Sequence, residues 1–208
     1  MPLFITFEGG EGSGKSTQAG LLAKRLEAQG VSVLLTCEPG GTELGDRISN
    51  LLKWGDGISI SPIAELMLFN ASRAELVSRV IKPALDAGQV VVSDRFADSS
   101  LVYQGYGRGL PLASVRAASS IAAQGLIPDI TFLLDVPTEH GFARKGSAKT
   151  DRIEQEHADF HRRVRDGYLA AARAEPDRWV IVNGTLPEAT VTEHIWQAVQ
   201  ARLSQRTG

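Results

Sequence analysis

The chain has 208 residues, and its 22 basic and 24 acidic side chains give a formal net charge of −2. This length predicts one domain, and the near-neutral balance excludes the strong positive field of a dedicated nucleic-acid-binding protein. One cysteine, Cys37, excludes an internal disulfide framework, and no apolar run reaches the roughly 18 residues of a membrane span. The N-terminal segment meets Glu8 too soon for a signal peptide. We therefore expect one cytoplasmic domain over residues 1–208, with neither a membrane nor a nucleic-acid partner.

Apolar patterning predicts strands that alternate with helices. The expected strands are 3–8, 31–36, 89–93, 130–135 and 178–182. The expected helices are 15–29, 44–54, 61–80, 112–124, 138–144, 154–173 and 187–203. Ser61 and Pro62 fit the N-cap and first positions of a helix that Pro83 is expected to kink or end. This alternation predicts an α/β fold with a five-stranded parallel sheet covered by helices on both faces, and ligands beyond the carboxyl ends of its strands.

Glycine is unusually frequent and clustered, with 10 of its 21 occurrences in the windows 9–14, 40–45 and 105–109. The first window lies in Gly-Gly-Glu-Gly-Ser-Gly-Lys-Ser, which fits the phosphate-loop pattern G-x-x-x-x-G-K-[ST] between a predicted strand and helix. Lys15 would reach the β- and γ-phosphates, and the Ser16 hydroxyl would ligate Mg²⁺. The pattern predicts a P-loop NTPase fold whose nucleotide site comprises Gly10, Glu11, Gly12, Ser13, Gly14, Lys15, Ser16 and Thr17.

Because phosphate loops serve kinases, GTPases and other ATPases, the rest of the chain must separate these classes. The sequence contains no Asn-Lys-x-Asp motif for reading guanine. The third predicted strand is followed by Asp94 and Arg95, where motor ATPases carry an Asp-Glu pair. An arginine at this position could neutralise a second anion, the acceptor, and this favours a small-molecule kinase.

Two further motifs follow the second and third strands: Glu-Pro-Gly-Gly-Thr at 38–42 and Val-Ser-Asp-Arg-Phe-Ala-Asp-Ser-Ser-Leu-Val-Tyr-Gln at 92–104. With the phosphate loop, they closely resemble thymidylate kinases of the bacterial type, in the same order and over nearly the whole chain. The resemblance implies transfer of the γ-phosphoryl group of ATP to dTMP, with Mg²⁺, to supply dTTP for DNA replication. It also implies a homodimer, for which the helix after Ser61 has enough apolar residues.

The resemblance assigns roles to individual residues. Arg95 would grip the phosphate of dTMP, Asp94 would lie near Mg²⁺, and Glu11 would contact the 3′-hydroxyl group. Phe69 would stack on thymine and Arg73 would donate to a thymine carbonyl; four residues apart, they share one helix face. The implied dTMP site comprises Glu11, Glu38, Pro39, Arg47, Phe69, Arg73, Arg95, Ser99, Ser100, Tyr103 and Gln104.

A short, glycine-containing basic segment at 144–152 is the expected lid over the phosphates. Related bacterial enzymes without an arginine in the phosphate loop usually supply lid arginines, whereas this segment carries lysines between Arg144 and Arg152. We expect Arg144 or Arg152 to act on the transferring phosphoryl group, with Lys145 or Lys149 assisting. Lys15 and Arg95 complete the expected catalytic set. No catalytic base is assigned, because the dTMP phosphate is largely deprotonated near neutral pH.

Three positions are expected to be structural: Cys37 as a small buried residue, and Asp98 and Arg108 as residues without a role in the site. Two other functions stay open at this point. One is a kinase for another nucleoside monophosphate or a deoxynucleoside, and the other is a P-loop switch or regulatory ATPase without an acceptor. Arg95 with Arg47 favours a phosphorylated acceptor, and Phe69 with Arg73 favours thymine.

Overall fold

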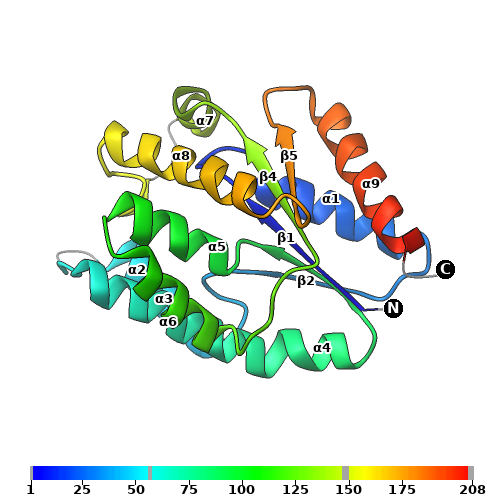
Figure 1. Ribbon diagram of the computed structural model, residues 1–208, viewed down its shortest axis with the longest axis horizontal. Helices are drawn as coiled ribbons and strands as arrows, with labels where there is room; N and C mark the ends of the chain where they lie inside the picture. Colours follow the sequence, from blue (N-terminus) through cyan, green and yellow to red (C-terminus); the bar gives the residue numbers. More distant parts are fainter. Residues whose placement is uncertain (1, 56–57, 147–149, 206–208) are drawn as a thin grey trace.

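A computed structural model describes residues 2–55, 58–146 and 150–205. Within them the strands form one parallel sheet in the order β2-β3-β1-β4-β5 (Figure 1). The strands are β1 (Leu3–Glu8), β2 (Val33–Cys37), β3 (Val90–Asp94), β4 (Ile130–Asp135) and β5 (Trp179–Asn183). The predicted parallel sheet is confirmed, and each strand begins and ends within two residues of its expected position.

Helices cover both faces of this sheet, because successive side chains of each strand point to opposite sides. In β1, Leu3, Ile5 and Phe7 pack with α1 and α9, whereas Phe4 packs on the other face with α3 and η1. The described helices are α1 (Lys15–Glu27), α2 (Glu43–Trp54), α3 (Pro62–Leu76), α4 (Lys82–Asp86), α5 (Ala97–Ser100), α6 (Leu112–Ala122), α7 (Thr138–Lys145), α8 (Ala158–Ala174) and α9 (Glu188–Gln205), with the π-helical segments η1 (Val77–Ile81) and η2 (Leu101–Gly107).

The helix after Ser61 begins as predicted but ends later. The Ser61 hydroxyl accepts a hydrogen bond from the Ala64 backbone, and Pro62 occupies the first turn. Beyond Leu76 the chain continues through η1 and α4 to Asp86, so the predicted end near residue 80 is wrong. Pro83 is tolerated because it lies in the first turn of α4, just after the wider π-helical turn. A proline therefore need not end a helix whose register changes immediately before it.

Residues 97–107, for which the sequence predicted no helix, form α5 and η2. Two glycines of this segment allow close packing. A Cβ on Gly105 would lie 2.6 Å from Leu112 of α6, and one on Gly107 would lie 2.6 Å from Phe160 of α8. The third glycine window thus brings η2 against its neighbouring helices.

The helix predicted over 154–173 starts later than expected. α8 begins at Ala158, whereas residues 152–155 form a turn. The Asp151 carboxylate accepts hydrogen bonds from the backbone nitrogens of Ile153 and Glu154, both at 2.9 Å. Local bonding of this kind competes with helix formation and explains the delayed start.

Candidate active site

A cavity of about 770 Å³ opens at the carboxyl ends of the strands, where the sequence predicted the ligands. Four predicted site residues do not line it: Gly10, Arg47, Arg73 and Arg152. The predicted residues that line it are Glu11, Gly12, Ser13, Gly14, Lys15, Ser16, Thr17, Glu38, Pro39, Phe69, Asp94, Arg95, Ser99, Ser100, Tyr103, Gln104 and Arg144. Most of the predicted nucleotide and acceptor residues therefore meet around one cavity.

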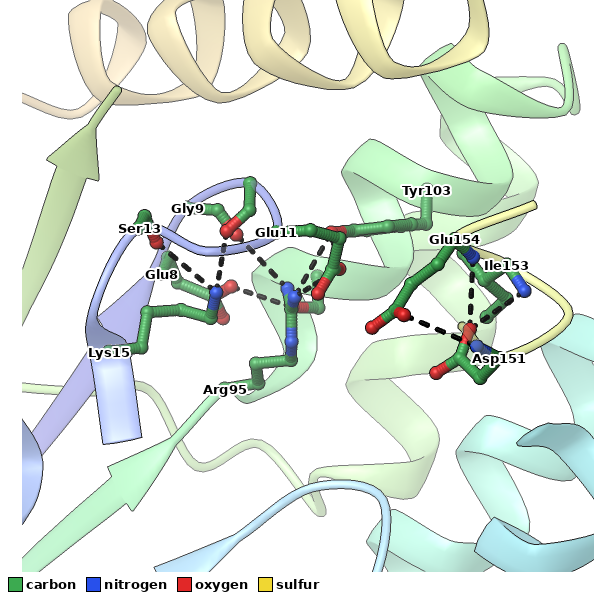
Figure 2. Close-up of polar contacts among 12 residues, drawn as sticks. Glu8, Gly9, Glu11, Ser13, Lys15, Arg95, Tyr103, Asp151, Ile153 and Glu154 are labelled. Atoms are coloured by element: carbon green, nitrogen blue, oxygen red, sulfur yellow. Dashed lines mark hydrogen bonds and ion pairs between the residues drawn. The ribbon is translucent and has the colours of Figure 1, made fainter. Parts of the chain in front are cut away.

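The phosphate loop curls around the ammonium group of Lys15 (Figure 2). The Lys15 Nζ atom donates to the Gly10 carbonyl oxygen at 2.7 Å and to the Ser13 hydroxyl at 3.2 Å. Gly14, with φ of 92°, precedes α1, so the loop enters the helix through a conformation that favours glycine. Burial and the nearby Arg95 lower the pKa of Lys15 to about 8. Gly10 thus reaches the site through its carbonyl group, although it does not line the cavity.

Arg95 lies at the centre of a polar network at the end of β3 (Figure 2). Its Nη2 atom donates to the Glu11 carboxylate at 2.7 Å and to the Tyr103 hydroxyl at 3.0 Å. Its Nη1 atom donates to the Tyr168 hydroxyl at 3.1 Å and the Ser99 hydroxyl at 3.3 Å. Burial raises the pKa of Glu11, but Arg95 and Lys15 outweigh it and lower this pKa to about 2. The pair therefore remains ionised, and the guanidinium group is held beside the phosphate loop.

A second carboxylate, Glu8, supports this network from behind. It is fully buried and accepts hydrogen bonds from the Ser99 hydroxyl at 2.6 Å and the Tyr168 hydroxyl at 2.7 Å. Burial and the nearby Asp98 raise the pKa of Glu8, whereas Arg95 acts in the opposite direction. Sequence reasoning assigned no role to Glu8 or Tyr168. Glu8 could have been suspected from the sequence, because it is a charged residue at the end of a largely apolar predicted strand.

Four residues predicted to bind the base, Phe69, Ser100, Tyr103 and Gln104, line the cavity together. Arg73, four residues from Phe69, lies behind this wall and is only 1% exposed. Its guanidinium group donates to Glu38 at 2.8 Å and to the Ser100 hydroxyl at 3.0 Å. Burial raises the pKa of Glu38 to about 7 despite the adjacent arginine. In this conformation Arg73 supports the pocket wall through these contacts.

Three further predicted arginines, Arg144, Arg152 and Arg47, have different surroundings. Arg144 lines the cavity and donates to the Gly184 carbonyl oxygen at 2.8 Å. Arg152 donates to Glu65 at 2.6 Å, away from the cavity. Arg47 is 77% exposed and pairs with Glu43 on its own helix. Of the three, only Arg144 is brought to the phosphate side in this conformation.

The lid is described only in part. Lys145 lines the cavity and forms an ion pair with Glu154. Lys149, the other expected assisting cation, lies outside the described residues. The ion pair holds the end of α7 against the segment after the lid.

An oxygen-rich position lies between the phosphate loop and β3. The Ser16 hydroxyl donates to Asp94 Oδ2, and Asp94 Oδ1 is buried without a hydrogen-bond partner in the described part of the chain. A buried carboxylate oxygen normally has a partner. Hydroxyl and carboxylate oxygens are ligands that suit Mg²⁺, so these two residues fit a site for that ion.

Three structural expectations have mixed outcomes. Asp98 and Arg108 pair with Arg178 and Glu65 respectively, as predicted for structural charges. Cys37 was expected to be buried, but it is exposed at the end of β2 and lines the cavity. Its strand lies at the edge of the sheet, so no neighbouring strand covers it beyond β3.

The comparison with known proteins identifies the family. The thymidylate kinase family model matches residues 7–195. The chain belongs to the thymidylate kinase family. A thymidylate kinase from a Synechococcus species is 52% identical over 205 residues, covering 99% of this chain and 98% of the relative. One from Dehalococcoides mccartyi is 51% identical over 203 residues, covering 98% of each chain.

A solved structure gives the same relationship. The crystal structure of thymidylate kinase from Ehrlichia chaffeensis aligns with a TM-score of 0.78 and 34% identity, covering 95% of this chain and 98% of that one. This likeness and the family match confirm the predicted P-loop fold and the resemblance to thymidylate kinases. Within the residues that the structure describes, no helix is both long and apolar enough to cross a bilayer.

Proposed function

We propose that this chain transfers the γ-phosphoryl group of ATP to dTMP, giving ADP and dTDP for dTTP synthesis. Membership of the thymidylate kinase family supports this activity. The single observation that carries the proposal here is Arg95, which pairs with Glu11 of the phosphate loop and lines the same cavity as Phe69. A cation beside the phosphate loop and an aromatic ring in one cavity suit a nucleoside monophosphate acceptor.

In the proposed reaction, a phosphate oxygen of dTMP attacks the γ-phosphorus of ATP, and the bond from that phosphorus to the β-phosphate oxygen breaks. The second pKa of a phosphate monoester is about 6, so the attacking oxygen needs no catalytic base near neutral pH. Lys15 would bind the β- and γ-phosphates, and Arg95 would hold the dTMP phosphate for attack. The chain would thus accelerate the reaction by positioning the two substrates and by neutralising the negative charge of their phosphates.

Mg²⁺ is the expected cofactor. Ser16 and Asp94 are proposed to hold it, since one Asp94 oxygen is buried and has no partner among the described residues. The ion would neutralise charge on the β- and γ-phosphates. Ser16 already faces Asp94, so the two oxygen groups need no large rearrangement to share a ligand.

Arg144 is the proposed lid arginine. It lines the cavity, whereas Arg152 is bound to Glu65 in this conformation. Lys145 is proposed to assist from the end of α7, and Lys149 keeps the role expected from the sequence. Arg152 would join the phosphate site only if it left Glu65. Separate Arg144→Lys and Arg152→Lys variants distinguish these roles, with a lower kcat expected for the first.

The thymine side of the site is proposed to include Phe69, Ser100, Tyr103 and Gln104, with Arg73 acting through Ser100. Glu11 would contact the sugar, Ser99 would support Arg95, and Glu38 with Pro39 would close the cavity beside β2. Arg47 is exposed and does not line the cavity, so its proposed contact with the acceptor needs movement of its side chain or of α2.

The test is an ADP-release assay with dTMP, dUMP, dCMP, dGMP and thymidine as acceptors. We expect dTMP to stimulate ADP release most. Greater stimulation by another acceptor would contradict the substrate assignment, and turnover without any acceptor would favour the switch or regulatory ATPase. A parallel Arg95→Ala variant should lose most of the dTMP-dependent rate.

We also propose that the chain acts as a homodimer through α2, α3 and α6. Contacts between α2 and α3 and between α3 and α6 make these helices neighbours. Their exposed large apolar side chains are Leu44, Leu51, Trp54, Ile63, Met67 and Ile121. Burying these apolar side chains against a second copy of the chain is favourable, and exposed apolar patches often mark interaction sites. Light scattering should give twice the monomer mass, and Ile63→Glu should shift the protein towards monomer; a monomeric wild type would contradict the proposal.

The chain is further proposed to work as one nucleoside monophosphate kinase domain over residues 1–208, since the phosphate loop and most of the acceptor residues line one cavity beside one sheet. We place the reaction in the cytoplasm, with ATP and dTMP as its partners. The single cysteine agrees with a reducing compartment.

A further inference from the structure

Glu65, on α3, is a buried carboxylate behind the acceptor side of the cavity. Its side chain is 1% exposed and accepts hydrogen bonds from three residues of different segments. Gln104 of η2 donates through Nε2 at 2.9 Å, Arg108 through Nη2 at 3.0 Å, and Arg152 through Nη2 at 2.6 Å. Neither the phosphate loop nor the Arg95 network contacts this carboxylate in the described part of the chain.

The charge state of Glu65 follows from these partners. Burial would raise its pKa, but the hydrogen bonds from Arg108, Gln104 and Arg152 outweigh burial and lower the pKa. An ionised carboxylate can only accept hydrogen bonds. Each group that faces Glu65 must therefore be a donor.

The need for a donor determines the orientation of the Gln104 side-chain amide. A carboxamide has a donor nitrogen at one edge and an acceptor oxygen at the other. Because Nε2 faces Glu65, the Oε1 atom is directed to the opposite edge, and it receives no hydrogen bond from any described residue. Gln104 lines the cavity beside Phe69 and Ser100. The available group of Gln104 is therefore an acceptor.

We propose that Glu65 is a positioning residue that holds the Gln104 carboxamide oxygen towards the acceptor cavity, so that the site prefers a base with an N–H group at that edge. The inference rests on the proposed function and deepens it. Thymine carries a hydrogen at N3, whereas neutral cytosine has a lone pair there. Two facing acceptors cannot form a hydrogen bond, and a buried polar group without a partner weakens binding.

Glu65 has a second structural connection that the test must separate. Arg152 also donates through Nε to the Leu52 carbonyl oxygen at 3.0 Å, and its backbone nitrogen donates to the Lys53 carbonyl oxygen at 3.2 Å. Glu65 thus links the segment after the lid to α2 and α3. A loss of this link would alter turnover with any base, whereas a reversed Gln104 amide would alter the choice of base.

The experiment measures binding of dTMP and dCMP by calorimetry in the full chain and in Glu65→Gln. A neutral amide at residue 65 can donate or accept, so it permits the Gln104 amide to reverse. We expect the preference for dTMP over dCMP to fall by about tenfold or more, the size of one lost hydrogen bond. The matched control is Glu156→Gln, because Glu156 contacts Arg108 on the far side and touches neither Gln104 nor Arg152. The control should keep the wild-type preference.

Two further variants separate positioning from general stabilisation. Glu65→Asp keeps an ionised acceptor and should retain the preference. The double variant Glu65→Gln with Gln104→Glu places the carboxylate at residue 104, where its oxygens can face both residue 65 and the cavity, and it should regain the preference. An unchanged preference in folded Glu65→Gln, or no recovery in the double variant, would overturn the proposal. Lack of turnover with dTMP would instead contradict the proposed function, since the preference is measured by binding alone.

Discussion

Gly12 of the phosphate loop and Gly141 of α7 meet backbone to backbone. A Cβ on Gly141 would lie 2.1 Å from the Glu11 carbonyl oxygen, and one on Gly12 would lie 2.0 Å from the Gly141 carbonyl oxygen. The helix that leads into the lid is thus seated directly on the tip of the loop. The two glycines permit an approach that no larger side chain allows.

Gly141→Ala should therefore disturb the phosphate loop by direct contact with its backbone. Overpacking of a close contact costs about 1–3 kcal/mol, which corresponds to roughly tenfold or more in affinity. We expect kcat/KM for ATP to fall by about tenfold, measured in steady-state assays at saturating dTMP. Gly20→Ala in α1 is the matched control, because a Cβ there meets no atom within 4 Å. Equal effects of the two variants would contradict the role of the contact.

Lys15 should give ATP binding a distinctive pH dependence. Its pKa of about 8 is below the ordinary value for lysine, so the free protein loses this positive charge as the pH rises through 8. The phosphates of ATP favour the charged form, and binding at pH 8 should take up about half a proton. Calorimetry in buffers of different ionisation enthalpy measures this uptake, which should fall to about one tenth of a proton at pH 7. Proton release at pH 8 would contradict the assignment.

The hydroxyl group of Tyr168 should matter for dTMP more than for ATP. Tyr168→Phe removes an acceptor for Arg95 and a donor for the buried Glu8. A lost buried hydrogen bond costs about 1–3 kcal/mol, so we expect kcat/KM for dTMP to fall about tenfold and the melting temperature to decrease. Tyr106→Phe is the control, since Tyr106 lies in the neighbouring η2 and its hydroxyl takes no part in the hydrogen bonds of Arg95 or Glu8. A Tyr168 variant with wild-type kinetics would show that Arg95 is held without this contact.

Arg178 allows a buried and an exposed ion pair to be compared on one guanidinium group. It pairs with Asp98, whose side chain is 10% exposed, and with Glu175, whose side chain is 39% exposed. Asp98→Ala should lower the free energy of unfolding by about 3 kcal/mol, because it removes the buried bidentate partner and leaves Arg178 with the more exposed Glu175. Glu175→Ala should cost about 1 kcal/mol or less. Urea unfolding measures both losses of stability. Similar values would show that the buried Asp98 pair contributes no more to the free energy of unfolding than the exposed Glu175 pair.

The phosphate loop could be predicted from the sequence because its geometry is local. The strand, the glycines, Lys15 and α1 follow one another along the chain, so the pattern itself specifies the site. Phe69 and Arg95 also line the cavity. The position of Arg95 after a strand pointed to the acceptor side, whereas Phe69 was assigned by the resemblance, because its helical spacing fits a core position equally well.

The surroundings of Arg73 and Arg152 could not be predicted in this way. Arg73 bonds to Glu38, 35 residues away, and Arg152 bonds to Glu65, 87 residues away. Both pairs join α3, which carries Arg73 and Glu65, to loop residues from other parts of the fold. Cys37 was misplaced for a related reason, since its exposure depends on the position of β2 at the sheet edge. In each case the surroundings of the residue depend on segments that are distant in the sequence.

The most direct test of the central claim is the identity of the product. The full chain is incubated with ATP, Mg²⁺ and dTMP, and the nucleotides are separated and quantified by chromatography. We predict that dTDP and ADP form in equal amounts, and that Arg95→Ala makes both far more slowly. Formation of ADP without dTDP would contradict the account.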